Sequence, residues 1–162
     1  VIGANTISAS GEMGSRLDTA VVFRASGPDN SFLRAVSGLQ GLPARPYEIG
    51  AEITVARDGY RLRNATAQFG GFALRAQGEI STLPDFSGTQ LGVAVSGPDL
   101  RNVALLTGIE ELPDGAFELA GMLAIDEGDL RLSEVTAIVG DLRGALAGRI
   151  GLAGNSGQFD LE

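Results

Sequence analysis

Apolar and polar residues alternate along much of this chain, and the alternation predicts β-strands. In 47–56, and again in 117–126, an apolar residue occupies every second position. A period of two places successive side chains on opposite faces of a strand, so each segment has one apolar and one polar face. The same pattern predicts strands over 6–13, 72–81 and 90–95.

The alternation changes parity in the middle of two further segments, 60–69 and 130–139. A strand with a regular register would turn half of its apolar side chains to the wrong face after such a change. One extra residue, a β-bulge, keeps a single face apolar along the whole strand. We therefore predict bulges near Arg63-Asn64 and near Ser133-Glu134.

The pattern also repeats on a larger scale. Ser26-Gly27-Pro28-Asp29 returns as Ser96-Gly97-Pro98-Asp99, and 26–80 aligns with 96–150 without a gap, at a shift of about 70 residues. A fixed period of this length indicates a repeated supersecondary unit whose copies stack and share one continuous core.

The repeat divides the chain into three parts of one continuous, elongated domain. We assign 1–25 to the last strands of a truncated preceding repeat, 26–95 to the first repeat, and 96–162 to the second, with its last strand truncated. The chain is therefore expected to be a segment of a longer protein.

Each repeat is also expected to contain one short helix. Ser26 and Asp29 fit a capping box, in which the serine side chain accepts a backbone N–H of the first helical turn. A helix over 30–37 follows in this prediction, and Gly38 provides its left-handed end. The second copy repeats the arrangement after Ser96.

These elements predict a mainly β protein: an elongated antiparallel meander with one short helix in each repeat of about 70 residues. About ten strands at a spacing of about 4.8 Å form a sheet roughly 48 Å wide. Two short helices, each about 10 Å across, cover less than half of one face of such a sheet. The remaining apolar face is then curled into a trough, closed by more chain, or filled by an apolar ligand.

Composition excludes most catalytic chemistry. The chain has no His and no Cys, which removes Cys/His nucleophile pairs, His general bases and zinc sites built from these side chains. Glu110, Glu111 and Asp114 have no catalytic partner nearby and are interpreted as a solvated loop. The run 126–129 lacks the spacing of a calcium loop and is interpreted as a turn. We expect no enzyme activity, no catalytic residue, no metal site and no cofactor.

The charge balance narrows the possible partners. The net charge is -8, from 20 acidic residues against 12 basic residues, all of which are arginine. An acidic surface without a basic cluster argues against binding nucleic acid through its phosphates. No apolar run approaches the roughly 18 residues that a membrane-spanning helix needs.

The repeated unit can be written as Ser-Gly-Pro-Asp, a short helix, Gly-(Leu/Ile), Leu-Pro, and strands with (Tyr/Leu)-Arg-Leu, Thr-Ala, Gly and (Ala/Leu)-x-Gly-(Glu/Arg)-Ile. This unit covers nearly all of the chain and resembles the bacterial AsmA-like family, which includes the large envelope proteins AsmA, TamB and YhdP. The resemblance implies a repeating β-groove, a long twisted sheet shaped like a taco with an apolar concave face.

The resemblance also implies a function. Proteins of this kind look like bridges that carry phospholipid acyl chains across the periplasm between the inner and outer membranes. They are usually anchored in the inner membrane by an N-terminal helix. The implied partners are phospholipid acyl chains, flanking repeats of the same chain, and proteins at the inner and outer membranes.

Within such a groove, the lipid contacts are expected from large apolar residues on the inward face of the strands. Burying an acyl chain gains about 0.8 kcal/mol per CH₂, so a continuous trough holds a lipid tail without one decisive polar contact. The predicted lipid-groove residues are Ile49, Ile53, Val55, Leu62, Phe69, Phe72, Leu74, Ile80, Leu119, Leu123, Ile125, Leu132, Val139, Leu142, Leu146 and Ile150.

The same inward residues are also compatible with an ordinary closed core. Under this alternative, the chain is a structural or adhesive β-repeat module with a sealed interior and no ligand. The two readings differ in their response to Leu123→Asp, because an unpaired carboxylate unfolds a sealed core but is tolerated in an open groove.

Overall fold

The fold is given by a computed structural model that describes residues 4–12, 19–29, 45–82, 86–101, 113–126, 129–151 and 157–161. Within these residues the chain is almost entirely β-strand. The predicted helix over 30–37 and most of its counterpart in the second repeat lie outside the described residues.

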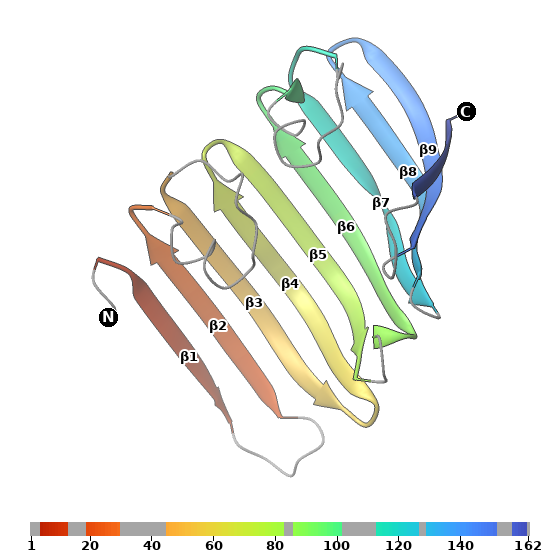
Figure 1. Cartoon of the computed structure of the whole chain (residues 1–162). Helices are drawn as coiled ribbons and strands as arrows, with labels where there is room; N and C mark the ends of the chain where they lie inside the picture. Colours follow the sequence, from red (N-terminus) through yellow and green to blue (C-terminus); the bar gives the residue numbers. More distant parts are fainter. Residues whose placement is uncertain are drawn as a thin grey trace.

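Ten strands form a single sheet. They are β1 (Thr6–Glu12), β2 (Ala20–Gly27), β3 (Tyr47–Ala56), β4 (Gly59–Phe69), β5 (Phe72–Ser81), β6 (Thr89–Gly97), β7 (Phe117–Asp126), β8 (Asp129–Val139), β9 (Leu142–Gly151) and β10 (Gly157–Leu161). Neighbouring strands are antiparallel, and their order in space follows the chain. The sheet is twisted and open, with β1 at one edge and β10 at the other (Figure 1). The predicted antiparallel meander is confirmed.

Strand pairing in the second half of the sheet follows that in the first half. Tyr47 at the start of β3 pairs with Phe69 at the end of β4, and Phe117 at the start of β7 pairs with Val139 at the end of β8. Each of these partners is shifted by about 70 residues from its counterpart. The repeat seen in the sequence is therefore also a repeat of strand register.

The predicted bulges are present in both β4 and β8. Between Leu62 and Ala65, β4 has one residue more than β5 opposite it, and β8 has the same excess over β9. The extra residues are marked by positive φ angles, 49° at Asn64 and 53° at Glu134. Ala65 comes three positions after Leu62, an odd offset that would place the two side chains on opposite faces of a regular strand. Because of the bulge, both face the same side of the sheet.

The Ser-Gly-Pro-Asp motif does not form the expected capping box. Ser26 and Ser96 are strand residues, paired on both sides within the sheet. In the second copy the Oδ1 of Asp99, and not the serine, accepts the backbone N–H of Arg101, at 3.0 Å. Hydrogen bonds from the Arg101 side chain and backbone hold the pKa of the Asp99 carboxyl below its ordinary value of 3.8. The serine prediction was wrong because the strand ladder continues through this residue.

Gly97 of the motif is required by the aromatic rings that lie over it. Phe72 and Phe117 stand on the two neighbouring strands, and their ring centroids are 6.1 Å apart. A Cβ on Gly97 would lie 2.7 Å from an atom of each ring. Gly27 has the same place under Tyr47, where the corresponding distance would be 2.8 Å. The glycine therefore allows an aromatic ring to pack directly on the sheet backbone.

These rings belong to a buried cluster at one end of the strands. Phe117 is 2% exposed, and Leu100, from the residues that follow β6, is 7% exposed. The cluster consists of Phe72, Leu100, Phe117 and Val139, with Phe69, Val95 and Leu119 packed against it. Most of the sheet's apolar side chains lie outside this cluster and keep part of their surface in contact with solvent.

Candidate functional site

The two faces of the sheet differ sharply in charge. Directly opposed residues of antiparallel strands project from the same face, so strand register assigns each side chain to a face. Arg61 and Glu79 pair across β4 and β5 on one face and form an exposed ion pair of 2.9 Å. On the other face, the paired strand residues that the structure describes include no Asp, Glu or Arg. We call this uncharged side the apolar face.

A row of small side chains crosses the middle of the apolar face at right angles to the strands. Ala65 pairs with Ala76, and Ala76 pairs with Val93. Val93 pairs with Gly121, where a Cβ would lie only 2.7 Å from Cγ2 of Val135 on β8. We call Ala65, Ala76, Val93, Gly121 and Val135 the small-residue row.

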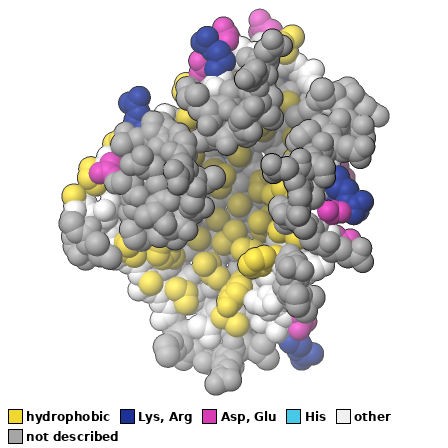
Figure 2. All heavy atoms as spheres, in the orientation of Figure 1, with side chains coloured by type: hydrophobic (Ala, Val, Ile, Leu, Met, Phe, Trp, Pro, Cys, Tyr) yellow, Lys and Arg dark blue, Asp and Glu magenta, His cyan; other side chains and the backbone are white. Residues whose placement is uncertain are grey.

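Mostly larger aliphatic side chains flank the small-residue row on both sides. The first flanking row is Ile49, Ala67, Leu74, Val95, Leu119 and Ala137. The second flanking row is Ile53, Leu62, Gly78, Leu91, Leu123 and Leu132. All of these residues are half-buried. Figure 2 shows hydrophobic side chains gathered over the middle of this face. We call the small-residue row together with its two flanking rows the furrow.

The two sides of the furrow differ in their contact with solvent. Beyond the first flanking row, the sheet is sealed by the buried cluster around Phe117. Beyond the second flanking row lies a last row that includes Tyr60, which is 42% exposed, and Ile80, which is half-buried. The furrow is therefore sealed around Phe117 and reaches solvent at Tyr60, whereas Thr89, in the same last row, is 3% exposed.

All predicted lipid-groove residues whose side chains the structure describes share the apolar face. Phe72 and Val139 are buried in the cluster, so they support the furrow and do not line it. Leu142 is 66% exposed, and the backbones of Leu146 and Ile150 pair with those of Val135 and Leu130. Ile49, Leu74 and Leu119 belong to the first flanking row, and Ile53, Leu62, Leu123 and Leu132 belong to the second. Val55, Ile80 and Ile125 lie in the last row. Phe69 packs beside the buried cluster.

Sequence reasoning missed the small-residue row. The prediction selected large apolar side chains, whereas the middle line of the furrow consists of the smaller ones between them. The sequence contains a signal for this row. Leu74, Ala76, Gly78 and Ile80 occupy alternate positions and therefore lie on one face of their strand, and Ala76 and Gly78 are small residues between two large ones. Weighing side-chain size along each apolar face, and not only polarity, would have identified the row.

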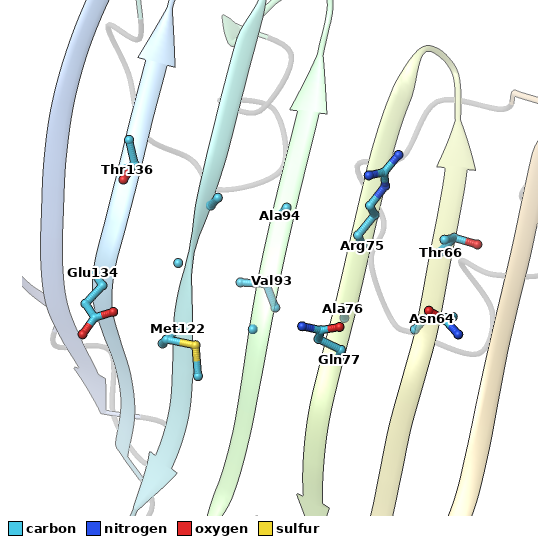
Figure 3. Close-up of a pocket in the computed structure, with 14 residues that line it drawn as sticks. Asn64, Thr66, Arg75, Ala76, Gln77, Val93, Ala94, Met122, Glu134 and Thr136 are labelled. Carbon is cyan, nitrogen blue, oxygen red and sulfur yellow. The ribbon is translucent and has the colours of Figure 1, made fainter. Parts of the chain in front are cut away.

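The opposite face has a hollow of about 750 Å³ behind the small-residue row (Figure 3). The bulge residues Asn64 and Glu134 lie on its two sides, and Arg75, Gln77 and Met122 lie between them. One cation, one anion, two amides and a thioether, spread over β4, β5, β7 and β8, do not select a class of ligand. The apolar face is therefore the stronger candidate site.

Two other kinds of site were sought in the part of the chain that the structure describes. No three acidic side chains gather there as metal ligands, and no helix is long and apolar enough to cross a bilayer. No family model, curated protein or solved structure matches the chain. The likeness to AsmA-like proteins therefore rests on the repeated sequence motifs.

Proposed function

We propose that this chain is a segment of a lipid-transfer protein whose furrow holds phospholipid acyl chains. The observation that carries the proposal is the small-residue row, because it gives an uncharged face a line of shorter side chains with mostly longer aliphatic side chains on both sides. The row crosses strands β4 to β8, so the furrow follows the direction in which the sheet grows. An extended acyl chain has the shape and chemistry that such a surface excludes from water.

The furrow continues without a break from the first repeat to the second. At the junction of β6 and β7, the small-residue row continues from Val93 to Gly121. The second flanking row continues there from Leu91 to Leu123. Each buried CH₂ gains about 0.8 kcal/mol wherever it lies, so equivalent positions along the furrow hold a lipid tail with similar strength. A surface of this kind supports sliding along its length.

The solvent-reaching side of the furrow provides room for the polar headgroup. A phospholipid has a charged end that must stay hydrated, because burying an unpaired charge is costly. The last row, with exposed Tyr60, leaves that end in water while the tails lie over Leu62 and Ala65. The family resemblance extends the proposal to a periplasmic bridge between the inner and outer membranes, anchored in the inner membrane.

The second candidate is a structural or adhesive repeat module with no ligand. It is favoured by the buried cluster, in which Phe117 is 2% exposed and packed as in a closed core. Under this candidate, the half-buried rows complete that core and have no binding role.

Adjacent residues of β7 provide a test with a matched control. Leu123 lies on the apolar face, and Met122, which is 40% exposed, lies on the opposite face. We expect Leu123→Asp to abolish binding of a phospholipid with a fluorescent acyl chain, presented in phosphatidylethanolamine vesicles. Met122→Asp should leave that binding unchanged, because its carboxylate projects away from the furrow.

Circular dichroism and thermal unfolding separate the two candidate functions. In an open furrow, Leu123→Asp costs about 1–3 kcal/mol of stability and leaves a folded chain. Loss of the folded state in Leu123→Asp, with no lipid binding by the unmodified chain, would favour the sealed module.

A further inference from the structure

The apolar face extends beyond the furrow onto β2, which lies next to the edge strand β1 (Figure 1). Ala25 on β2 pairs with Ile49 of the first flanking row. Val21, also on β2, pairs with Ile53 of the second flanking row. The line between the two flanking rows therefore crosses β2 halfway from Val21 to Ala25, at Phe23.

Phe23 places a phenyl ring in this line. It pairs with Ala9 on β1 and with Ala51 on β3, and the small-residue row continues the line from β4 onward. Among the members of the line whose side chains the structure describes, Phe23 is the only aromatic residue, and the others are Ala, Val or Gly. Side chains of a strand stand roughly perpendicular to the sheet, so the ring rises above the methyl groups beside it.

The corresponding position in the following unit holds a smaller residue. Phe23 and Val93 are related by the shift of about 70 residues that relates the repeats. Phe23 pairs with Ala51 where the sheet enters the first repeat, and Val93 pairs with Gly121 where it enters the second. The line therefore passes from the first repeat to the second over valine and glycine, whereas a phenyl ring stands in the line where it enters the first repeat.

We propose that Phe23 is a barrier that ends the lipid site at β3. The proposal rests on the proposed function of the furrow. An acyl tail that lies along the small-residue row reaches β3 over Ala51, and there it meets the ring, which stands where the tail would continue. The tail is retained on β3 to β8, and its transfer to β1 requires the ring to move aside. Phe23 thus determines which strands can share one tail.

The ring acts by its size and not by its polarity. Phe23 is half-buried, so part of its surface stays open to solvent on the apolar face. Phenylalanine and valine are both apolar, and the exchange of one for the other leaves the charge of the face unchanged. An acyl tail therefore distinguishes the two residues only by the space that they occupy. This makes Phe23→Val, which copies Val93, a direct test of the barrier.

Photocrosslinking of a bound lipid reports which strands the tail reaches. The chain is incubated with phosphatidylethanolamine vesicles that contain a phosphatidylethanolamine with a diazirine on its acyl chains. After irradiation, the crosslinked peptides are identified by mass spectrometry. We expect crosslinks on β3 to β8 and few on β1. In Phe23→Val the share on β1 should rise by at least about ten-fold, because a tail that crosses β2 buries about two or more further CH₂ groups.

Val93→Phe is the reciprocal variant, and it leaves the packing at β2 untouched. Its new ring stands between Ala76 and Gly121, as Phe23 stands between two alanines. We expect the yield of crosslinks on β6 and β7 to fall by about ten-fold, because the ring takes the place of the same stretch of tail. Circular dichroism establishes that each variant is folded.

The outcomes separate the barrier from the lipid site itself. A folded Phe23→Val chain with the crosslink distribution of the unmodified chain would overturn the barrier and leave the lipid site intact. Equal crosslinking of β1 and β3 in the unmodified chain would do the same. Where Phe23→Val does not fold, an unchanged yield on β6 and β7 in folded Val93→Phe would overturn the barrier. No crosslink on any strand of the unmodified chain would overturn the proposed function, and the barrier with it.

Discussion

Gly97 has no side chain, and this allows the rings of Phe72 and Phe117 to pack directly on the sheet backbone. We expect Gly97→Ala to lower the free energy of unfolding by about 1–3 kcal/mol, because the new methyl group forces the Phe72 and Phe117 rings off the backbone. A Cβ there would be 2.7 Å from an atom of each ring. Urea unfolding followed by circular dichroism measures the change.

Gly92 offers a matched control in the same strand. It lies on the opposite face, where a Cβ would be 3.7 Å from Met122 Sδ, an ordinary contact. Gly92→Ala should cause no loss, since alanine is favoured over glycine within a strand by about 0.5–1 kcal/mol. Equal destabilisation by Gly92→Ala and Gly97→Ala would contradict the role given to the rings.

The bulge residues carry a second prediction at this scale. Glu134 has a φ of 53°, a left-handed conformation that costs most residues about 1–2 kcal/mol and that asparagine adopts more readily. We expect Glu134→Asn to raise the unfolding midpoint, because Asn64 holds the equivalent position at a φ of 49°. The reciprocal change, Asn64→Glu, should lower the midpoint. Shifts of the same sign in both variants would show that backbone conformation does not decide stability here.

At the scale of the strand, the bulge keeps β4 amphipathic. Deleting Asn64 removes the extra residue and the parity change with it, because Leu62 and Ala65 then stand two positions apart and face the same side of a regular strand. We expect the free energy of unfolding to change by no more than about 1 kcal/mol, because every large apolar side chain of β4 keeps its face. Chemical denaturation of the deletion variant measures the change.

Asn64→Gly is the control for this deletion. Glycine keeps the residue count and adopts positive φ readily, so the bulge and the register are retained. A deletion variant less stable than Asn64→Gly by about 3 kcal/mol or more would contradict this expectation, because it would mean that β4 does not form a regular strand once the extra residue is removed.

The alternation of side chains predicted most of the sheet. It located the strands and both bulges, because a buried face imposes a strict period of two and every departure from it must be accommodated. The serine of Ser-Gly-Pro-Asp was misread, since the sequence does not show where a strand ladder ends and a turn begins. Contacts such as that between the rings of Phe72 and Phe117 depend on strands far apart in the sequence.

The candidate site was predicted in part. Polarity placed the large residues on one face, and the structure confirms that Leu62, Leu74 and Leu123 share it. Burial could not be predicted in the same way, because Phe72 and Leu142 occupy equivalent positions with 9% and 66% exposure. That difference arises from which segment lies above each strand, and the periodicity of a strand carries no information about it.

At the scale of the whole molecule, the two faces of the sheet differ in the side chains that they present. Charged side chains such as Arg61 and Glu79 keep one face in water, and the other face presents the furrow. The sheet is open, so strands can be added at either edge without interrupting the rows. A molecule built in this way can lengthen its furrow by adding repeats while every strand keeps the same pattern.

Native mass spectrometry of the purified chain tests the lipid-holding furrow most directly. The chain is incubated with vesicles of phosphatidylethanolamine and phosphatidylglycerol and then separated from them. Its mass is measured under non-denaturing conditions, and the Leu123→Asp variant is treated in the same way. We expect discrete mass increments of whole phospholipids on the unmodified chain and none on the folded variant. A bare protein mass for the unmodified chain after incubation would contradict the furrow as a lipid site and leave the sealed repeat module as the better account.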